Sequence, residues 1–317
     1  MKKFGGRGNG GATALHKKKL SKNQIELIML TAIPLLFVVV FNYLPMFGVI
    51  IAFKDYRYDL GILGSDWVGL DNFLCFFRTN DFWNITKNTL VMNFGFIFIG
   101  QLCAIALAIL FYEVKSRRAI KTYQTLAIVP NFLSWVVVGY IGYAFLQPTN
   151  GFINRAIESL GGSGVDWYNT PKVWPAILIV TSVWKHVGMD CIIYYATMMS
   201  IDSELYEAAA LDGANKWKQI VHVTIPGLIP IIVIIAIMQV GRIFRADFGL
   251  FYQMTRDIGA LYSTTDVLDT YIYRTMRVLG DMSTSSAMGL LQSAVGFVLV
   301  ILTNHITKKI DSSLSLF

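Results

Sequence analysis

Charged and amide side chains interrupt two otherwise apolar stretches of the sequence. Ionised groups at membrane depth are costly, and they usually face one another or a water-filled path. Two interpretations are open: Lys185 or Arg242 pairs internally with Asp190 or Asp247, or the groups line a path for a polar substrate. Arginine on such a path would suit a carboxylate, because the guanidinium matches its geometry. The candidate path residues are Trp184, Lys185, His186, Asp190, Gln239, Arg242 and Arg245.

Other chemistries find little support. The four histidines fall on separate segments, and His186 with Asp190 offers only two ligands on one helix face, so we predict no metal site. No Gly-Lys pair occurs, which excludes a nucleotide-binding loop of the G-x4-GK[ST] type. The three cysteines are odd in number and widely spaced, which excludes a disulfide framework. We therefore predict no catalytic residues and no cofactor bound to this chain.

The elements that must position these groups are membrane-spanning helices. Of the 317 residues 55% are hydrophobic and 15% are charged, whereas soluble domains contain about a quarter charged residues. A helix needs about 20 apolar residues to cross a bilayer. Five such stretches are 25–44, 89–111, 126–146, 173–199 and 286–306, and a further one starts after Pro226 with GLIPIIVIIAIMQV. The sequence therefore predicts an all-α integral membrane protein with six transmembrane helices.

Lysine and arginine are divided unequally between the two sides of these helices. Fifteen lie in the two terminal tails and the loops that share their side, and nine lie in longer loops on the other side. Both termini are therefore expected in the cytoplasm. The net charge of +7 is explained by this orientation and by anionic lipid, without nucleic acid as a partner.

The same division predicts the organisation of the chain. Residues 1–24 form a basic cytoplasmic tail, and residues 25–85 form the first transmembrane helix and an external loop. Residues 86–308 form a core of five further transmembrane helices, and residues 309–317 form a cytoplasmic C-terminal tail. The external segment from about 250 to 285 is polar enough that we expect it to face solvent.

The cytoplasmic loop over residues 200–226 is amphipathic and too polar to cross a membrane. Asp202 is a natural N-cap for a helix through SELYEAAAL, and Gly213 follows as a helix stop. A second short helix over residues 216–223 is expected to end against Pro226. The product is a helix–turn–helix elbow beneath the bilayer, suited to docking into a groove of a partner.

This elbow carries a spaced motif, EAA-x3-G-x9-I-x-L-P, which resembles the loop of the inner-membrane permease subunits of binding-protein-dependent ABC importers. The positions that follow the motif are Glu207, Ala208, Ala209, Gly213, Val223, Ile225 and Pro226. Valine for isoleucine at 223 and isoleucine for leucine at 225 depart from the motif, but both swaps are apolar and similar in volume.

Further features are similar to one branch of that family. Asp212-Gly213-Ala214 and Pro230 resemble the carbohydrate importers. The extra N-terminal helix, the WVGLDNF stretch and the length resemble the maltose-permease type, and more closely the LplB-like polysaccharide permeases. The resemblance covers the chain from about the second span to the C-terminus.

The resemblance implies a type I ABC importer permease fold in the bacterial cytoplasmic (inner) membrane, working by alternating access. It implies a heterodimer with a second homologous permease subunit, two copies of a cytoplasmic ABC ATPase that hydrolyse ATP with Mg²⁺, and an external solute-binding protein that delivers a carbohydrate. The residues that would couple the permease to the ATPase are Glu207, Ala208, Ala209, Asp212, Gly213 and Pro226.

With a carbohydrate as substrate, the cationic candidates on the path would suit an acidic sugar such as a uronate oligosaccharide. Trp184, Tyr194 and Tyr195 offer aromatic faces on which sugar rings can stack. The alternative function is an ATP-independent secondary carrier or channel. That class would need inverted repeats or paired broken helices, and no persuasive repeat relates the first three spans to the last three. A membrane scaffold would not require ionisable residues at mid-depth.

Overall fold

The structure is a computed structural model that describes residues 21–310. The predicted tails over 1–24 and 309–317 fall largely outside the described residues. The chain divides into two compact units, the first up to Val49 and the second from Ile50 onward. Within the described part, helices account for nearly all regular structure, and the only strands are the two-residue β1 (Lys54–Asp55) and β2 (Asp66–Trp67), which pair antiparallel.

The first unit is helical throughout its described residues. It contains α1 (Lys22–Val38), the π-helical turn η1 (Val39–Tyr43) and the start of the 3-10 helix η2 (Leu44–Phe53). Together they supply a candidate membrane span over Glu26–Phe53, which is longer than the predicted 25–44. Pro45 does not end the span; it lies two residues after the end of the π-helical turn η1, and the helix continues through it as η2.

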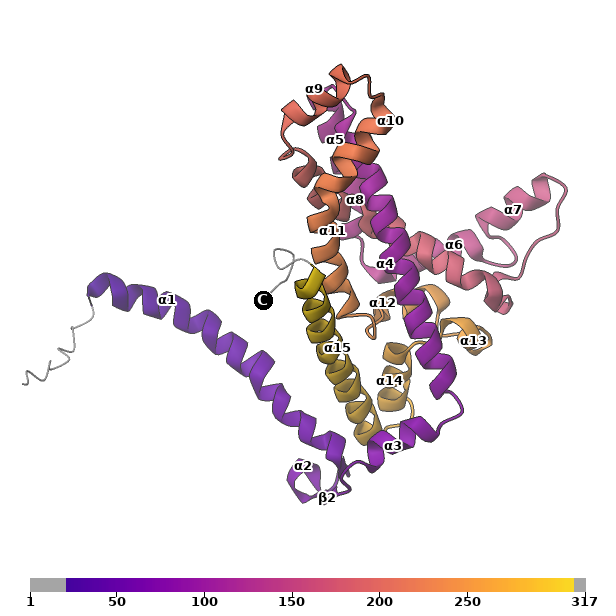
Figure 1. The fold of residues 1–317 in the computed structure, drawn as a ribbon. Coiled ribbons are helices and arrows are strands. Elements are labelled where there is room, and N and C mark those ends of the chain that lie inside the picture. The colour runs from indigo at the N-terminus through magenta and orange to yellow at the C-terminus, as the bar shows by residue number, and fades with distance from the viewer. Residues whose placement is uncertain (1–20, 311–317) are drawn as a thin grey trace, which may run out of the picture. The chain divides into compact units, whose positions relative to one another are not determined.

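The second unit is built around four long helices, α4 (Phe82–Tyr112), α8 (Trp174–Met198), α11 (Ile225–Val240) and α15 (Met282–Ile310). In Figure 1, α4 packs along α8, and α11 contacts α4, α8 and α15. Two short helices precede α4: α2 (Gly61–Gly64) and α3 (Asp71–Arg78). Shorter elements between the long helices include α7 (Phe152–Ser159), η4 (Trp167–Asn169), η5 (Pro171–Val173) and α9 (Ser203–Leu211). The elbow containing α9 lies at one end of this bundle, and α3 lies at the other.

The third predicted span is not one straight helix. It consists of α5 (Arg117–Ile128) with the 3-10 turn η3 (Val129–Phe132), followed by α6 (Trp135–Leu146), and the two parts meet at 95°. Leu133 is extended, and Ser134 starts a new helix by accepting a hydrogen bond from the Val137 N–H. The described residues therefore contain five helices able to cross a membrane, or six if the bent pair is counted as one.

The fifth span begins earlier than predicted. The helix α10 (Lys216–Gln219), the π-helical turn η6 (Ile220–Thr224) and α11 follow one another without a break, giving a candidate span over Lys216–Val240. The prediction that the second helix of the elbow ends against Pro226 is therefore wrong. Pro226 lies two residues after the end of the π-helical turn η6, and the helix continues through it as α11. The elbow is consequently one end of a transmembrane helix.

The segment expected to face solvent, about 250–285, is instead folded into the core. It forms α12 (Phe248–Thr255), η7 (Gly259–Leu261), α13 (Tyr262–Thr265) and α14 (Leu268–Arg277). Leu250, Phe251, Met254 and Leu261 are buried, and α12 packs on α6. The prediction was wrong because the apolar residues here recur at helical spacing in runs too short to suggest a membrane span.

A partly buried ionic cluster holds this segment together. Arg274 contacts Asp257 at 2.9 Å and Asp266 at 2.5 Å, and its guanidinium lies 4.1 Å from the ring centre of Tyr262. Burial raises the pKa of Asp266, and the hydrogen bond and charge of Arg274 partly oppose that rise. Arg274 on α14 is thus joined through two ion pairs to the segments that follow α12 and α13.

Candidate functional site

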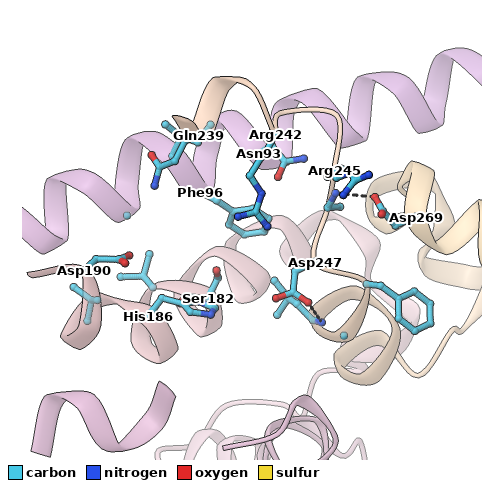
Figure 2. A pocket seen from close by; sticks show the side chains of 18 of the residues that line it. Asn93, Phe96, Ser182, His186, Asp190, Gln239, Arg242, Arg245, Asp247 and Asp269 are labelled. Atoms are coloured by element: carbon cyan, nitrogen blue, oxygen red, sulfur yellow. Dashed lines mark hydrogen bonds between the residues drawn. The ribbon is translucent and has the colours of Figure 1, made fainter. Parts of the chain in front are cut away.

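A cavity of about 780 Å³ opens between α4, α8, the end of α11 and the start of α12. Five of the seven predicted path residues line it, and they come from two separate spans, the fourth and the fifth. These residues are His186, Asp190, Gln239, Arg242 and Arg245. Figure 2 shows Asp190 and Gln239 on one side of the cavity and Arg245 and Asp269 on the other. The structure therefore brings together the polar groups of the two predicted stretches in one cavity.

The loop that carries the arginines, residues 241–247, is held in place by two neighbouring spans. The side-chain amide of Asn93 on α4 donates to the Ile243 carbonyl at 2.9 Å. The side-chain amide of Gln292 on α15 donates to the Phe244 carbonyl at 2.6 Å. These bonds satisfy backbone groups that would be costly without partners in a membrane.

Asp269 on α14 completes this support. Its carboxylate accepts from the Ala246 N–H at 2.7 Å and from Gln292 at 3.0 Å. Burial raises the pKa of Asp269, and these hydrogen bonds partly oppose the rise. Asp269 is thus committed to backbone support, although it borders the cavity beside Arg245.

The two arginines keep their charge available. Arg242 and Arg245 are exposed, and neither is within ion-pair distance of a carboxylate among residues 21–310. One guanidinium nitrogen of Arg245 donates to the Ser293 hydroxyl at 3.1 Å. The internal pairing of Arg242 with Asp190 or Asp247, one of the two interpretations left open by the sequence, does not occur in this structure.

The opposite side of the cavity is built from amide and carboxylate groups. Gln101 on α4 donates to the side-chain oxygen of Gln239 on α11 at 2.8 Å, which joins these helices across the cavity wall. The ring nitrogen Nδ1 of His186 lies 3.0 Å from the Ser182 carbonyl oxygen, one turn back on α8. Asp190 borders the cavity without an ion-pair partner in the described part of the chain.

Lys185 has a different position from its neighbours. Its side chain is buried, and its ammonium donates to the carbonyls of Leu133, Asn131 and Pro130 at 2.6, 2.8 and 3.3 Å. It also lies 5.2 Å from the ring centre of Trp135. These carbonyls lie at the end of α5–η3, where a positive charge is favourable; the Pro130 carbonyl also accepts from the Leu133 N–H at 3.1 Å. Lys185 therefore stabilises the break in the third span and does not line the cavity.

Trp135 connects this break to the cavity. Its indole N–H donates to Asp247 at 2.8 Å, and the other oxygen of Asp247 accepts from the Leu250 N–H to cap α12. Trp184, in contrast, borders an apolar groove between α6 and α8 and is largely exposed. Of the predicted path residues, Trp184 and Lys185 are thus the two that lie outside the cavity.

The predicted elbow has the expected local structure up to its second helix. Asp202 caps α9 by accepting from the Glu204 N–H at 3.0 Å, and Asn215 caps α10 in the same way from Lys218. Gly213 between them has φ +77°, a conformation that side chains with a Cβ rarely adopt. The motif residues surround this turn: Glu207, Ala208, Asp212, Gly213 and Pro226 are exposed, and Ala209 is half-buried.

The elbow is attached to α4 and carries apolar side chains on its outside. Lys216 pairs with Glu113 at 3.1 Å, and the Tyr206 and Thr224 hydroxyls lie 3.0 Å apart. Leu211 is 90% exposed and Trp217 is 71% exposed. A rigid polar elbow that presents exposed leucine and tryptophan has the character of a docking surface.

Sequence reasoning missed the cavity residues outside spans four and five. Asn93 lines the cavity and Gln101 lies beside it, eight residues further along the second span, while Gln292 lies in the predicted sixth span; amides within apolar helices were an available signal. Asp269 had no such signal, because its role depends on its contact with Ala246. No group of three or more metal-ligating His, Cys, Asp or Glu side chains occurs within the described residues.

Comparisons with known proteins agree on one family. The family model described as "Binding-protein-dependent transport system inner membrane component" matches residues 100–312. The protein LplB of Bacillus subtilis (strain 168) is 35% identical over 277 residues, which cover 87% of this chain and 86% of LplB. The polygalacturonan/rhamnogalacturonan transport system permease protein YteP of the same organism is 35% identical, over 86% of this chain and 85% of YteP.

Solved structures agree with this result. A bacterial ABC transporter involved in the import of the acidic polysaccharide alginate has a chain that matches with a TM-score of 0.82 and 30% identity, over 92% of this chain and 97% of that chain. A second structure of a bacterial alginate ABC transporter, in complex with a periplasmic protein that holds an alginate pentasaccharide, matches with a TM-score of 0.81 at the same identity, over 91% of this chain and 96% of that chain.

Proposed function

The chain belongs to the family of binding-protein-dependent transport system inner membrane components, and on this premise we propose that it is the permease subunit through which an ATP-driven importer takes up an acidic oligosaccharide. The family match confirms the resemblance indicated by the loop motif, and the fold is that of an ABC importer permease. Two of the similar proteins are associated by name with acidic polysaccharides, polygalacturonan and alginate, which supports the choice of substrate class.

The observation that carries the proposal is the pair of arginines in the cavity. Arg242 and Arg245 border a space of about 780 Å³ and have no ion-pair partner among residues 21–310. A guanidinium that supports the structure normally has a carboxylate beside it, as Arg274 does. Two unpaired guanidiniums in a polar cavity inside a membrane protein suit an anionic substrate, because each can hold a carboxylate with two hydrogen bonds.

We propose that the elbow is the contact with a separate ATPase. The exposed Leu211 and Trp217 would enter a groove of that subunit, and Gly213 would allow the sharp turn between α9 and α10. Because α10 continues into α11, a displacement of the elbow would be carried along one helix to Gln239 and the arginines. The chain has no nucleotide-binding loop of its own, so ATP and Mg²⁺ would act on the partner.

The remaining partners follow from the same proposal. A second homologous permease subunit would complete the cavity, two ATPase copies would drive alternating access, and an external solute-binding protein would deliver the sugar. The chain would lie in the bacterial cytoplasmic membrane with both termini in the cytoplasm. The polarity of the cavity is then consistent with passage of a sugar between the two subunits.

The coupling role is tested by reconstituting the complete importer in proteoliposomes and measuring ATP-dependent uptake. Gly213→Pro cannot adopt the observed φ of +77°, because proline fixes φ near −65°. We expect this variant and Glu207→Lys to insert and assemble but to lose uptake. The matched controls are Gly161→Pro, at an exposed glycine with φ +84°, and Glu158→Lys. Normal uptake in both elbow variants would refute the coupling assignment.

The substrate class is tested by comparing trigalacturonate with neutral maltotriose in the same importer. Arg242→Ala or Arg245→Ala should reduce uptake of the acidic sugar by about tenfold or more, because a hydrogen bond to a charged group contributes about 1.5–3 kcal/mol. Uptake of any neutral sugar should change little. Equal losses for both sugars would remove the acidic-sugar assignment and leave the family assignment intact.

A further inference from the structure

A small second cavity adjoins the main one on the side of the elbow. It has a volume of about 50 Å³ and lies between α4, α8 and α11. It shares Phe96, Gly100, Asp190 and Gln239 with the main cavity, so the two spaces have a common wall. The residues found only in the small cavity, which we call the side chamber, are Gln101, Ala104, Ile193, Tyr194 and Ile235.

The side chamber contains a polar group without a partner. Tyr194 is 1% exposed, and its hydroxyl makes no hydrogen bond to any described residue. Native proteins rarely leave a buried hydroxyl unpaired, because its desolvation is then uncompensated. No described residue satisfies this hydroxyl, which leaves it free to bond with a water or with a ligand hydroxyl that reaches it from the chamber.

The other polar groups of the chamber also have unused capacity. The one hydrogen bond between Gln101 and Gln239 uses a nitrogen of the first and the oxygen of the second. The Gln101 oxygen and the Gln239 nitrogen are left available. Asp190 accepts no hydrogen bond from the described residues. The chamber thus offers acceptors at Asp190 and Gln101, and donors at Gln239 and Tyr194.

The mixture of hydrogen-bond donors and acceptors in the side chamber suits a ligand group that can both donate and accept. An alcohol both donates and accepts, so one hydroxyl can donate to the Asp190 carboxylate while it accepts from Tyr194 or Gln239. A volume of about 50 Å³ exceeds the space of one water, about 30 Å³, and is far too small for a sugar ring. One carboxylate and two neutral oxygens are too few for a divalent cation such as Ca²⁺, which takes six to eight oxygen ligands.

We propose that the side chamber is a subsite that binds one hydroxyl or hydroxymethyl group of the transported sugar. This inference rests on the proposed function and extends it, because it assigns an orientation to the substrate. The carboxylate of the sugar lies at Arg242 and Arg245, and a hydroxyl-bearing edge enters the chamber beside Asp190 and Tyr194. The permease thereby distinguishes free hydroxyls from substituted hydroxyls at the side chamber, and carboxylates from neutral groups at Arg242 and Arg245.

The test uses the complete reconstituted importer with saturating sugar-loaded binding protein, so that changes report on the permease. The probes are trigalacturonate, its hydroxyl-methylated derivative and its carboxyl methyl ester. Tyr194→Phe removes only the hydroxyl oxygen, and Tyr195→Phe is the matched control on the adjacent, half-buried tyrosine. A purely structural role of Tyr194 would reduce the uptake of every probe by the same factor.

We expect Tyr194→Phe to slow trigalacturonate uptake roughly threefold to tenfold, the range for one lost hydrogen bond. It should also weaken the preference for trigalacturonate over the hydroxyl-methylated probe, while the preference for acid over ester stays the same. Arg242→Ala should show the opposite pattern. Tyr195→Phe should behave like the wild type.

The outcomes separate this inference from the proposed function. If Tyr194→Phe matches Tyr195→Phe with every probe, the hydroxyl is satisfied by a resident water and the subsite is refuted, while uptake of trigalacturonate still supports the proposed function. If the wild type takes up maltotriose but no trigalacturonate, the acidic-sugar function is refuted, and the same two variants with maltotriose and its hydroxyl-methylated form decide on the chamber. Uptake of neither sugar overturns both.

Discussion

Lys185 should contribute more to the stability of this permease than any exposed lysine. The residue is 5% exposed, and its ammonium donates to three backbone carbonyls at 2.6, 2.8 and 3.3 Å. The third distance is long, so two of these are strong charge-assisted bonds. In Lys185→Met the side chain keeps much of its volume, but the carbonyls at the end of α5–η3 lose their donor at a place where the backbone has no helical partner.

The magnitude follows from two bounds. Hydrogen bonds to charged groups contribute about 1.5–3 kcal/mol each in soluble proteins. Interhelical hydrogen bonds in a membrane protein average about 0.6 kcal/mol and reach about 1.7. Two strong bonds to an otherwise unsatisfied helix end therefore suggest that Lys185→Met lowers the free energy of unfolding by about 2–4 kcal/mol.

The assay is unfolding of the purified protein in mixed micelles with an increasing fraction of SDS. Lys172→Met is the matched control, because this lysine is exposed at the start of the same span and should change stability by no more than about 0.5 kcal/mol. If both variants unfold at the same SDS fraction as the wild type, Lys185 does not stabilise the break, and the stated reason for its burial is wrong.

Two further predictions concern packing and pH. Gly188→Ala should abolish folded protein, because the new Cβ would overlap the Ala127 carbonyl oxygen. Gly289→Ala is the control, because a Cβ at that position meets open space. Gel filtration in detergent should show a folded peak for Gly289→Ala and none for Gly188→Ala. Arg274→Gln should destabilise by about 3 kcal/mol, and more at pH 8 than at pH 5. Without the guanidinium, the pKa of Asp266 rises further. When the folded-state pKa of a carboxyl is raised, the folded protein loses stability as the pH rises through that pKa. Melting curves should show no pH-dependent loss for exposed Arg277→Gln.

Hydropathy predicted where the chain enters the membrane, but it could not predict the direction of every helix. The stretches over 89–111, 173–199 and 286–306 lie within or close to α4, α8 and α15. The stretch over 126–146 is equally apolar, yet it turns by 95°. The groups that support this turn lie more than 50 residues further along the chain, at Lys185, so no local pattern records it.

The candidate site shows the same division between local and long-range information. Placing spans four and five at a common depth was sufficient to bring Asp190 and Gln239 near the arginines. The sequence could not decide which cation faces the cavity, because Lys185 and His186 are adjacent and differ in direction by about 100° on a helix. Packing decides it: Gly188 lets α8 approach the backbone of α5 closely, and that approach encloses Lys185.

This commitment of Lys185 has a consequence for selectivity. Because the charge of Lys185 is bound to backbone carbonyls, the positive charge of the cavity rests on Arg242 and Arg245. Asp247 and Asp269 also border the cavity, but each accepts hydrogen bonds that hold a helix start or a loop. The residues that shape the cavity are thus mostly distinct from those free to bind. Substitution of the arginines should therefore alter which sugar is carried while the fold persists, whereas substitution of Lys185 or Asp269 should affect the fold first.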